Sequence, residues 1–339
     1  AHTSTGLNLF FIMKISVFTA EKFRFEDEHI RRIVSAFSSA SVTVAKNEDE
    51  LLSLLPETEI LICGNYNYKE SWLSCGGKLK WIHSIAAGNE KIIPSLIGKP
   101  ILLTDSSGVH AVPIAEQVIG YMIMFERKLL AAVKSQGKKE WVNDLNVGEL
   151  NGKTALIVGL GAVGKGIAGL CKCLGMKVIA TKRAAGKTAA AAVSSLADEL
   201  YPAADAAEFE KILSAADYLV LSVPFTRETR HFFGKSEIAA MKRTACLINI
   251  ARGGVLDEEA LISALKGRRI AGAALDVFET EPLPEESQLW EMENVIITPH
   301  NAGLTPHYMD RVVKIFCSNL KAYLENKPMP NLVDKAKGY

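Results

Sequence analysis

One segment constrains the fold of this chain more than any other. The apolar run Thr154–Val158 leads directly into Gly159-Leu160-Gly161-Ala162-Val163-Gly164, and a helical pattern follows over residues 165–174. A strand, a G-x-G-x-x-G turn and a helix in this order predict a Rossmann-type unit that binds a dinucleotide. The first glycine permits the tight turn, the second lets the backbone approach a pyrophosphate, and the third lets the helix pack on the strand. The phosphates would then accept hydrogen bonds from N–H groups at the helix N-terminus.

The same pattern predicts which residues contact the cofactor. In the turn they are Gly159, Gly161, Ala162, Val163 and Gly164. The next predicted strand, 177–181, ends beside Lys182 and Arg183, where folds that select NAD usually carry Asp or Glu. A carboxylate there would repel a ribose 2′-phosphate, whereas a hydroxyl and two cations would bind it. We therefore predict that Thr181, Lys182 and Arg183 favour NADP(H) over NAD(H). The alternative is a solvated basic loop without selectivity.

Short apolar runs alternate with helical patterns along most of the chain. Before the glycine turn, the predicted strands are 15–19, 42–45, 59–63, 81–85 and 101–104. Helices are predicted at 29–37, 48–55, 114–134 and 306–324. After the turn, the further strands are 177–181, 218–223, 245–250, 273–277 and 295–298. Strands that alternate with helices imply parallel sheets covered on both faces, so the predicted fold class is α/β. The alanine-rich run 184–192 is expected to be a helix start or a loop, and the tail 327–339 is expected on the surface.

Composition argues against several classes of function. The 339 residues carry a formal net charge of +1, so no basic field favours nucleic acid or an anionic membrane. No apolar run reaches the length of a membrane span. The six cysteines are scattered, and Cys171-x-Cys173 has no second pair or histidine near it, so a zinc site is not expected. We expect free thiols in a reducing cytoplasm.

Three predicted strands are followed by polar residues suited to acid–base chemistry or anion binding. Arg252 follows the strand 245–250, and Glu281 and His300 follow the next two. In an open parallel sheet ligands bind at the carboxyl ends of the strands, so these side chains can converge. Histidine exchanges a proton near neutral pH, arginine grips a carboxylate with two hydrogen bonds, and a nearby glutamate favours the protonated imidazole. Taken singly, each residue could equally be structural. Together they predict hydride transfer on a 2-keto or 2-hydroxy acid.

With these residues in view, the chain resembles the D-isomer-specific 2-hydroxyacid dehydrogenases from Met13 to the tail. The resemblance rests on the Arg, Glu and His motifs in the family's order, and extends to 79–88, 224–229 and Leu289-Trp290. It implies a Rossmann-type cofactor domain, 113–304, inserted into a flavodoxin-like substrate domain formed by 13–112 and 305–339. Residues 1–12 are then expected to be a leader or tag. The resemblance also implies a homodimer built largely through the cofactor domains.

The resemblance assigns roles position by position. His300 matches the family's acid/base, Arg252 its substrate-binding arginine, and Glu281 the carboxylate paired with the histidine. The loop that receives the substrate carboxylate matches Ala87, Gly88 and Asn89. Further cofactor contacts fall on Val223, Pro224, Thr229, Ala251 and Asp276. The departures are the missing acid after the second strand, which puts NAD specificity in doubt, and Asn301, where an apolar residue is more common.

These observations predict an NADPH-preferring oxidoreductase that interconverts a small 2-keto acid and its D-2-hydroxy acid, with His300 as the acid/base. Glyoxylate and hydroxypyruvate are common substrates in the resembling family, while 2-ketopantoate and longer keto acids stay open. Two alternatives remain on the same scaffold. One is a nucleotide-sensing, corepressor-like binding protein, and the other is an NAD-linked formate or phosphite dehydrogenase.

Overall fold

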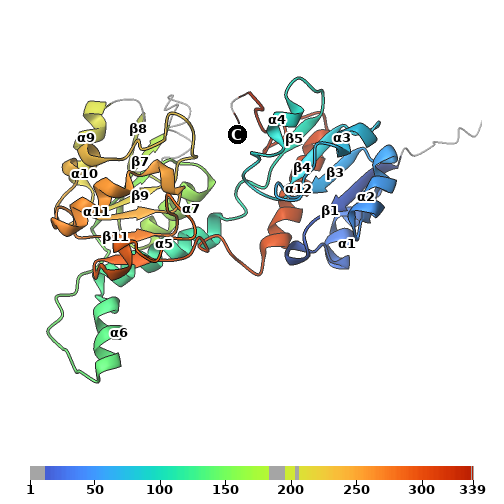
Figure 1. Ribbon diagram of the computed structural model, residues 1–339. Helices are drawn as coiled ribbons and strands as arrows, with labels where there is room; N and C mark the ends of the chain where they lie inside the picture. The colour runs from blue at the N-terminus through green and yellow to red at the C-terminus, as the bar shows by residue number, and fades with distance from the viewer. Residues whose placement is uncertain (1–11, 183–194, 203–205, 337, 339) are drawn as a thin grey trace, which may run out of the picture. The chain divides into compact units, whose positions relative to one another are not determined.

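The chain divides into two compact units in the computed structural model, which describes residues 12–182, 195–202, 206–336 and 338 (Figure 1). One unit comprises Ala1–Val109 and Thr305–Tyr339, and the other is His110–Leu304. Each unit has its own parallel sheet with helices around it. The fold is therefore of the α/β class, as the alternation of strands and helices predicted.

A five-stranded parallel sheet in the order β2-β1-β3-β4-β5 forms the centre of the first unit. Its strands are β1 (Met13–Phe18), β2 (Ala40–Val44), β3 (Ile60–Cys63), β4 (Trp81–Ser84) and β5 (Leu102–Thr104). Its helices are α1 (Asp27–Ala36), α2 (Glu48–Leu54), α3 (Trp72–Cys75), α4 (Ile93–Leu96) and α12 (Tyr308–Leu324), with 3₁₀ turns η1 (Glu21–Phe23) and η2 (Leu55–Glu57).

Strand β3 shows why the runs in this sheet are apolar throughout. All four of its residues are buried. Ile60 and Ile62 belong to a core cluster with side chains of α1 and α12, whereas Leu61 and Cys63 belong to one with side chains of α2 and α3. Successive strand residues point to opposite faces, so a sheet with helices on both faces needs apolar side chains at every position.

The second unit is built on a seven-stranded parallel sheet in the order β12-β11-β10-β9-β6-β7-β8. Its strands are β6 (Thr154–Val158), β7 (Lys177–Lys182), β8 (Glu199–Pro202), β9 (Tyr218–Leu221), β10 (Cys246–Asn249), β11 (Gly272–Leu275) and β12 (Val295–Ile297). Its helices are α5 (Ala111–Glu126), α6 (Leu129–Lys138), α7 (Ala162–Cys173), α9 (Ala206–Ala215), α10 (Lys235–Ala240) and α11 (Glu258–Lys266), with 3₁₀ turns η3 (Gly253–Val255) and η4 (Gln288–Glu291).

The strand order of this unit creates a switch point at β6. From β6 the chain builds β7 and β8 on one side, then returns to place β9 to β12 on the other. Helices α5 and α7 pack on one face, and α9, α10 and α11 supply buried side chains to the other. Ligands of open parallel sheets bind at the carboxyl ends of the strands beside such a switch point, which is where the glycine turn lies.

Several sequence-based expectations about elements were wrong. The single helix predicted over 114–134 is two helices, because Lys128 adopts a left-handed backbone (φ +53°) between α5 and α6. Strand β8 was not expected, and the alanine-rich run 184–192 lies outside the described residues. The tail is not wholly superficial: Met329 and Val333 are buried, and the Val333 amide donates to the Leu103 carbonyl at 2.9 Å.

The structure also bears on the thiols of the chain, on metal binding and on membrane spans. All six cysteines are free thiols. Over the described ranges, no group of three or more His, Cys, Asp or Glu side chains is placed to hold a metal ion. Among those same residues, no helix combines the length and apolar character that crossing a bilayer requires.

Candidate active site

The glycine turn after β6 has the form that a dinucleotide phosphate needs. Gly159 has a left-handed backbone (φ +104°), and a Cβ on Gly164 would lie 2.1 Å from the Gly159 carbonyl oxygen. A Cβ on Gly161 would meet nothing within 4 Å, and Gly161, as the N-cap residue of α7, has no side chain that could cap the helix. Two glycines are thus needed by the turn itself, while the third leaves open space beside uncapped helix amides. This arrangement fits a pyrophosphate.

The residues expected to select NADP(H) are only partly suited to that role. Thr181 is 1% exposed, so its hydroxyl is not presented to solvent. It lies inside β7, where both faces of the sheet are covered. Lys182 ends the strand and is partly exposed. Arg183 lies outside the described residues.

The other expected cofactor contacts follow β9 and β10. Val223 and Pro224 come just after the end of β9, and the Ser222 hydroxyl ahead of them donates to the Gly159 carbonyl at 2.6 Å. The Thr229 hydroxyl donates to the Pro224 carbonyl at 2.7 Å, so its side chain closes the turn over 224–229. The amide of Ala251 donates to the Asn249 side chain at 3.1 Å.

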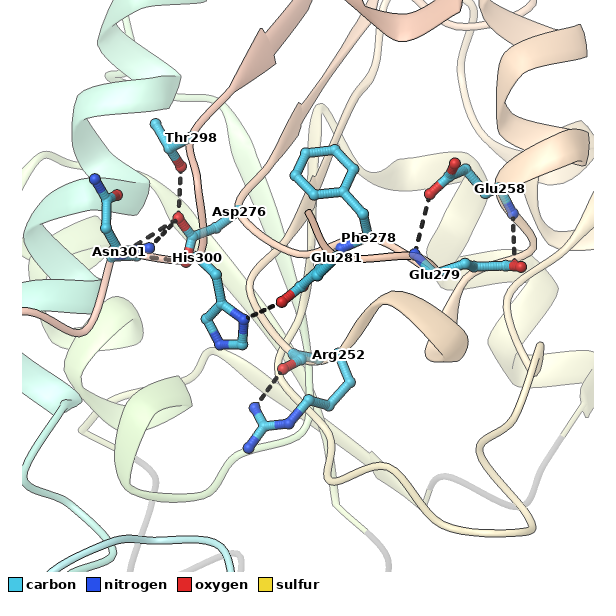
Figure 2. A network of polar contacts seen from close by, with 11 residues as sticks. Arg252, Glu258, Asp276, Phe278, Glu279, Glu281, Thr298, His300 and Asn301 are labelled. Carbon is cyan, nitrogen blue, oxygen red and sulfur yellow. Dashed lines mark hydrogen bonds and ion pairs between the residues drawn. The ribbon is translucent and has the colours of Figure 1, made fainter. Parts of the chain in front are cut away.

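His300 and Glu281 form a hydrogen-bonded pair in the second unit (Figure 2). The imidazole Nδ1 lies 2.7 Å from Glu281 Oε2, and the other carboxylate oxygen accepts the Phe278 amide at 3.1 Å. The side chains are 48% and 35% exposed, so both can be reached from solvent. Since Nδ1 is taken by the carboxylate, Nε2 is the ring atom left to exchange a proton with a ligand.

Arg252, drawn with this pair in Figure 2, follows β10 at the same edge of the sheet. Its side chain is exposed, and one guanidinium N–H donates to the Ala251 carbonyl at 2.7 Å. Asn249, fully buried at the end of the strand, holds the turn because its amide donates to the Arg252 carbonyl at 3.2 Å. A guanidinium has five donors, so one bond to the backbone leaves the planar fork able to bind a carboxylate.

The turn that carries Glu281 is fixed from two sides. A Cβ on Gly253 would lie 1.8 Å from the Phe278 carbonyl oxygen, so only glycine permits the approach of the two backbones. Glu258 and Glu279 accept each other's backbone amides at 3.2 and 3.3 Å. Glu279 also lies 2.8 Å from His231 Nε2, a second imidazole–carboxylate pair that the sequence did not reveal. A signal for Gly253 was present in the sequence, since adjacent glycines after a strand often mark a close backbone approach.

Asp276 has a different position from the one expected. It is 3% exposed, and its carboxylate accepts the Thr298 hydroxyl at 2.6 Å and the Asn301 amide at 3.0 Å. The Ala302 amide also donates to it, at 3.1 and 3.2 Å to the two oxygens. The structure therefore places Asp276 beneath the loop of His300, where its carboxylate is occupied by these donors.

The expected substrate loop belongs to the first unit, after β4. Ala87 and Gly88 are partly buried, and Asn89 is 4% exposed. The Asn89 amide lies 3.5 Å from the Asp105 carboxylate, and burial raises the pKa of Asp105 above its ordinary value. Asn89 Oδ1 has no hydrogen-bond partner within the described structure. The side chain of Asn89 thus points into the unit.

The chain is similar to known proteins in both sequence and fold. The model of the D-isomer specific 2-hydroxyacid dehydrogenase NAD-binding domain matches residues 119–302. A glyoxylate reductase of Thermofilum pendens is 32% identical over 85% of this chain and 85% of its own length. A D-3-phosphoglycerate dehydrogenase of Methanocaldococcus jannaschii is 30% identical over 89% of this chain, which spans only 57% of that enzyme. A structure of the NADPH-dependent glyoxylate/hydroxypyruvate reductase of Sinorhizobium meliloti, in complex with NADP and sulfate, superposes with a TM-score of 0.76 at 25% identity, covering 96% of this chain and 100% of that one.

The chain belongs to the D-isomer-specific 2-hydroxyacid dehydrogenase family. The match covers most of the second unit, and the relatives extend it over the first. The resemblance inferred from the Arg, Glu and His motifs is therefore confirmed.

Proposed function

We propose that this protein is an NADPH-preferring oxidoreductase that interconverts a small 2-keto acid and its D-2-hydroxy acid. The observation that carries the proposal is the hydrogen-bonded pair of His300 and Glu281, with an exposed Arg252 after a neighbouring strand of the same sheet. The three residues follow β12, β11 and β10, which are neighbours in the sheet, so the fold brings them to one edge. Acid–base and anion-binding groups at this edge match the needs of keto-acid reduction.

Each residue has a defined task in this proposal. Arg252 binds the substrate carboxylate and stabilises the negative charge that develops on the carbonyl oxygen. His300 donates a proton from Nε2 to that oxygen, or accepts it in the reverse direction. Glu281 holds the orientation of the ring through its hydrogen bond to Nδ1. When bound, NADPH supplies the hydride. In the first unit, Ala87, Gly88 and Asn89 remain our proposed substrate-binding positions.

The preference for NADPH is supported by residues at and after the end of β7. No acid stands at 181–183, where a carboxylate would repel the 2′-phosphate, and Lys182 offers a cation there. Among similar proteins, the Sinorhizobium meliloti enzyme is described as NADPH-dependent. A kcat/KM that is clearly higher with NADPH than with NADH is expected, and a preference for NADH would contradict the assignment.

The function is tested by following NADPH absorbance with a panel of acids. Glyoxylate and hydroxypyruvate are expected to be reduced, and 2-ketopantoate and longer keto acids show how far the site extends. D-3-phosphoglycerate with NADP⁺ tests the activity for which the Methanocaldococcus jannaschii relative is named. If the protein binds NADPH tightly but turns over no member of the panel, the result supports the alternative of a nucleotide-sensing, corepressor-like binding protein. Oxidation of formate or phosphite with NAD⁺ would support the alternative of a formate or phosphite dehydrogenase.

We also propose a cytoplasmic homodimer. The segment after α5 supports the dimer: α6 has no buried residues, and Val133 and Trp141 are 66% and 94% exposed. Figure 1 shows α6 standing away from the sheet of its own unit. Such exposed apolar area is costly unless another surface covers it. Sedimentation equilibrium is expected to give twice the chain mass, and a monomer at micromolar concentration would contradict the proposal. The six free thiols are consistent with a reducing compartment.

A further inference from the structure

Helix α5 is joined to the loop of His300 by a line of hydrogen bonds that the proposed chemistry does not use. The Gln117 amide donates to the Tyr121 hydroxyl oxygen at 3.0 Å, and that hydroxyl lies 2.5 Å from Thr298 Oγ1. The Thr298 hydroxyl donates to Asp276 at 2.6 Å. Tyr121 is 2% exposed and Asp276 is 3% exposed, so most of this line is withdrawn from water.

The direction of each hydrogen bond follows from the number of protons available. The single hydroxyl proton of Thr298 is given to the carboxylate, which already accepts two backbone amides. The hydrogen between Tyr121 and Thr298 must therefore come from Tyr121. Burial raises the pKa of the Tyr121 phenol above its ordinary value, so it keeps this proton at the pH of any ordinary assay. Every link in the line thus has one donor and one acceptor.

Asp276, the last residue of this line, accepts hydrogen bonds from residues on both sides of His300 in the sequence. Thr298 precedes the histidine by two residues, and the amides of Asn301 and Ala302 follow it, so the Asp276 carboxylate ties the loop together across His300 (Figure 2). His300 itself has a left-handed backbone (φ +50°), a conformation that is uncommon for residues with a Cβ. The hydrogen bonds to Asp276 stabilise this conformation together with the bond of 3.0 Å from the His300 amide to the Thr298 carbonyl.

We propose that Tyr121 and Thr298 are positioning residues for His300, which hold the loop over 298–302 so that the imidazole stays against Glu281. Neither residue needs to touch a substrate. The kinetic part of this inference rests on the proposed function, whereas the position of the ring does not.

The position of the ring can be measured by ¹⁵N NMR of the histidine side chains in the full-length protein without cofactor. The chain has seven histidines, and the signals of His300 are those missing from His300→Gln. The Glu281→Gln variant shows where these signals move when the carboxylate is lost. We expect Tyr121→Phe and Thr298→Val to move them in the same direction, and Thr298→Ser, which retains the hydroxyl, to leave them near the wild-type position.

Tyr218 provides a matched control. It is also 2% exposed, and its hydroxyl donates to Glu126 at 2.7 Å, next to the carbonyl of Met122, away from Asp276. Tyr218→Phe removes a buried tyrosine hydroxyl of the same kind and is expected to leave the His300 signals in place. The proposal is overturned if folded Tyr121→Phe and Thr298→Val keep wild-type signals, or if Tyr218→Phe shifts them equally.

Kinetics give the second readout. Tyr121→Phe is expected to lower kcat for keto-acid reduction by about tenfold, the factor that one hydrogen bond is worth in a rate. The KM of the keto acid and the Kd of NADPH should stay within about twofold, because neither ligand is held by Tyr121. A rise in KM as large as the fall in kcat would refute the role in positioning. An unchanged kcat in a variant whose ring signals are displaced would refute it as well. If the wild-type protein reduces no acid of the panel, the proposed function fails, and the NMR measurement still decides where the ring is held.

Discussion

His300 and His231 are two histidines of the same unit, and each lies within hydrogen-bonding distance of a glutamate. The distances are 2.7 Å to Glu281 and 2.8 Å to Glu279, and the side chains are 48% and 40% exposed. Both pairs join an imidazole to a carboxylate, but they lie at different positions in the unit. His300 follows β12 at the sheet edge where Arg252 follows β10, whereas Glu279 accepts the amide of Glu258 at the N-terminus of α11. Comparing their substitutions separates the role of the site from the general effect of losing an ion pair.

We expect His300→Gln to lower kcat by about two to four powers of ten, because general acid–base catalysis typically accelerates a reaction by that factor. His231→Gln should change kcat by less than about twofold. The Kd of NADPH, measured by fluorescence titration, should stay near the wild-type value in both variants, since neither ring belongs to the glycine turn. Undiminished turnover of His300→Gln would rule out the proposed acid/base, whichever substrate is used.

The turn between β6 and α7 offers a test at the level of an element, because its glycines have different tasks. Gly161→Ala places a methyl group in open space beside the helix N-terminus, so we expect an unchanged unfolding midpoint and a Kd for NADPH raised at least about tenfold. Gly164→Ala forces a methyl group to 2.1 Å from a carbonyl oxygen, so we expect destabilisation by more than about 1 kcal/mol. Thermal unfolding with and without NADPH measures both effects. A Gly161→Ala protein that binds NADPH normally would show that the phosphates lie elsewhere.

Most strands were predictable from the sequence, with β8 as an exception, whereas the contacts between elements were not. Apolar runs of four to six residues marked the strands because both faces of each sheet are covered, and this also placed Arg252, Glu281 and His300 at one edge. The break at Lys128 depends on a left-handed φ that no glycine announces. Thr181 is buried because β7 continues to Lys182, one residue beyond the predicted end of the strand. Tyr121 and Thr298 are 177 residues apart, and no local pattern encodes such a hydrogen bond.

At the level of the whole molecule, the two units differ in whether their described histidines are buried. His83 in β4 of the first unit is fully buried, and burial lowers its pKa to about 3. Its neutral ring is held in a directed network: Trp81 donates to Thr104 Oγ1, whose hydroxyl donates to Nδ1. On the other side Nε2–H donates to Ser106, whose hydroxyl is given to the Ser84 carbonyl. The described histidines of the second unit are His110, His231 and His300, and none of them is buried.

We therefore expect the first unit to lose stability as the pH falls from 7 to 5. The folded state keeps His83 neutral down to about pH 3, whereas the unfolded chain takes up a proton below its ordinary value of 6.5. The stabilisation is thus complete above pH 6.5 and declines by about 1.4 kcal/mol per pH unit below it, or about 2 kcal/mol by pH 5. Asp105 acts in the opposite sense, because its raised pKa favours the folded state as the pH falls, so the His83 effect must be taken as a difference from His83→Gln. Urea unfolding at pH 7 and pH 5 should show a smaller decline in the variant than in the wild type, with hydrogen exchange in acid rising first over residues 13–109. An equal decline in both proteins would mean that His83 is protonated in the folded state.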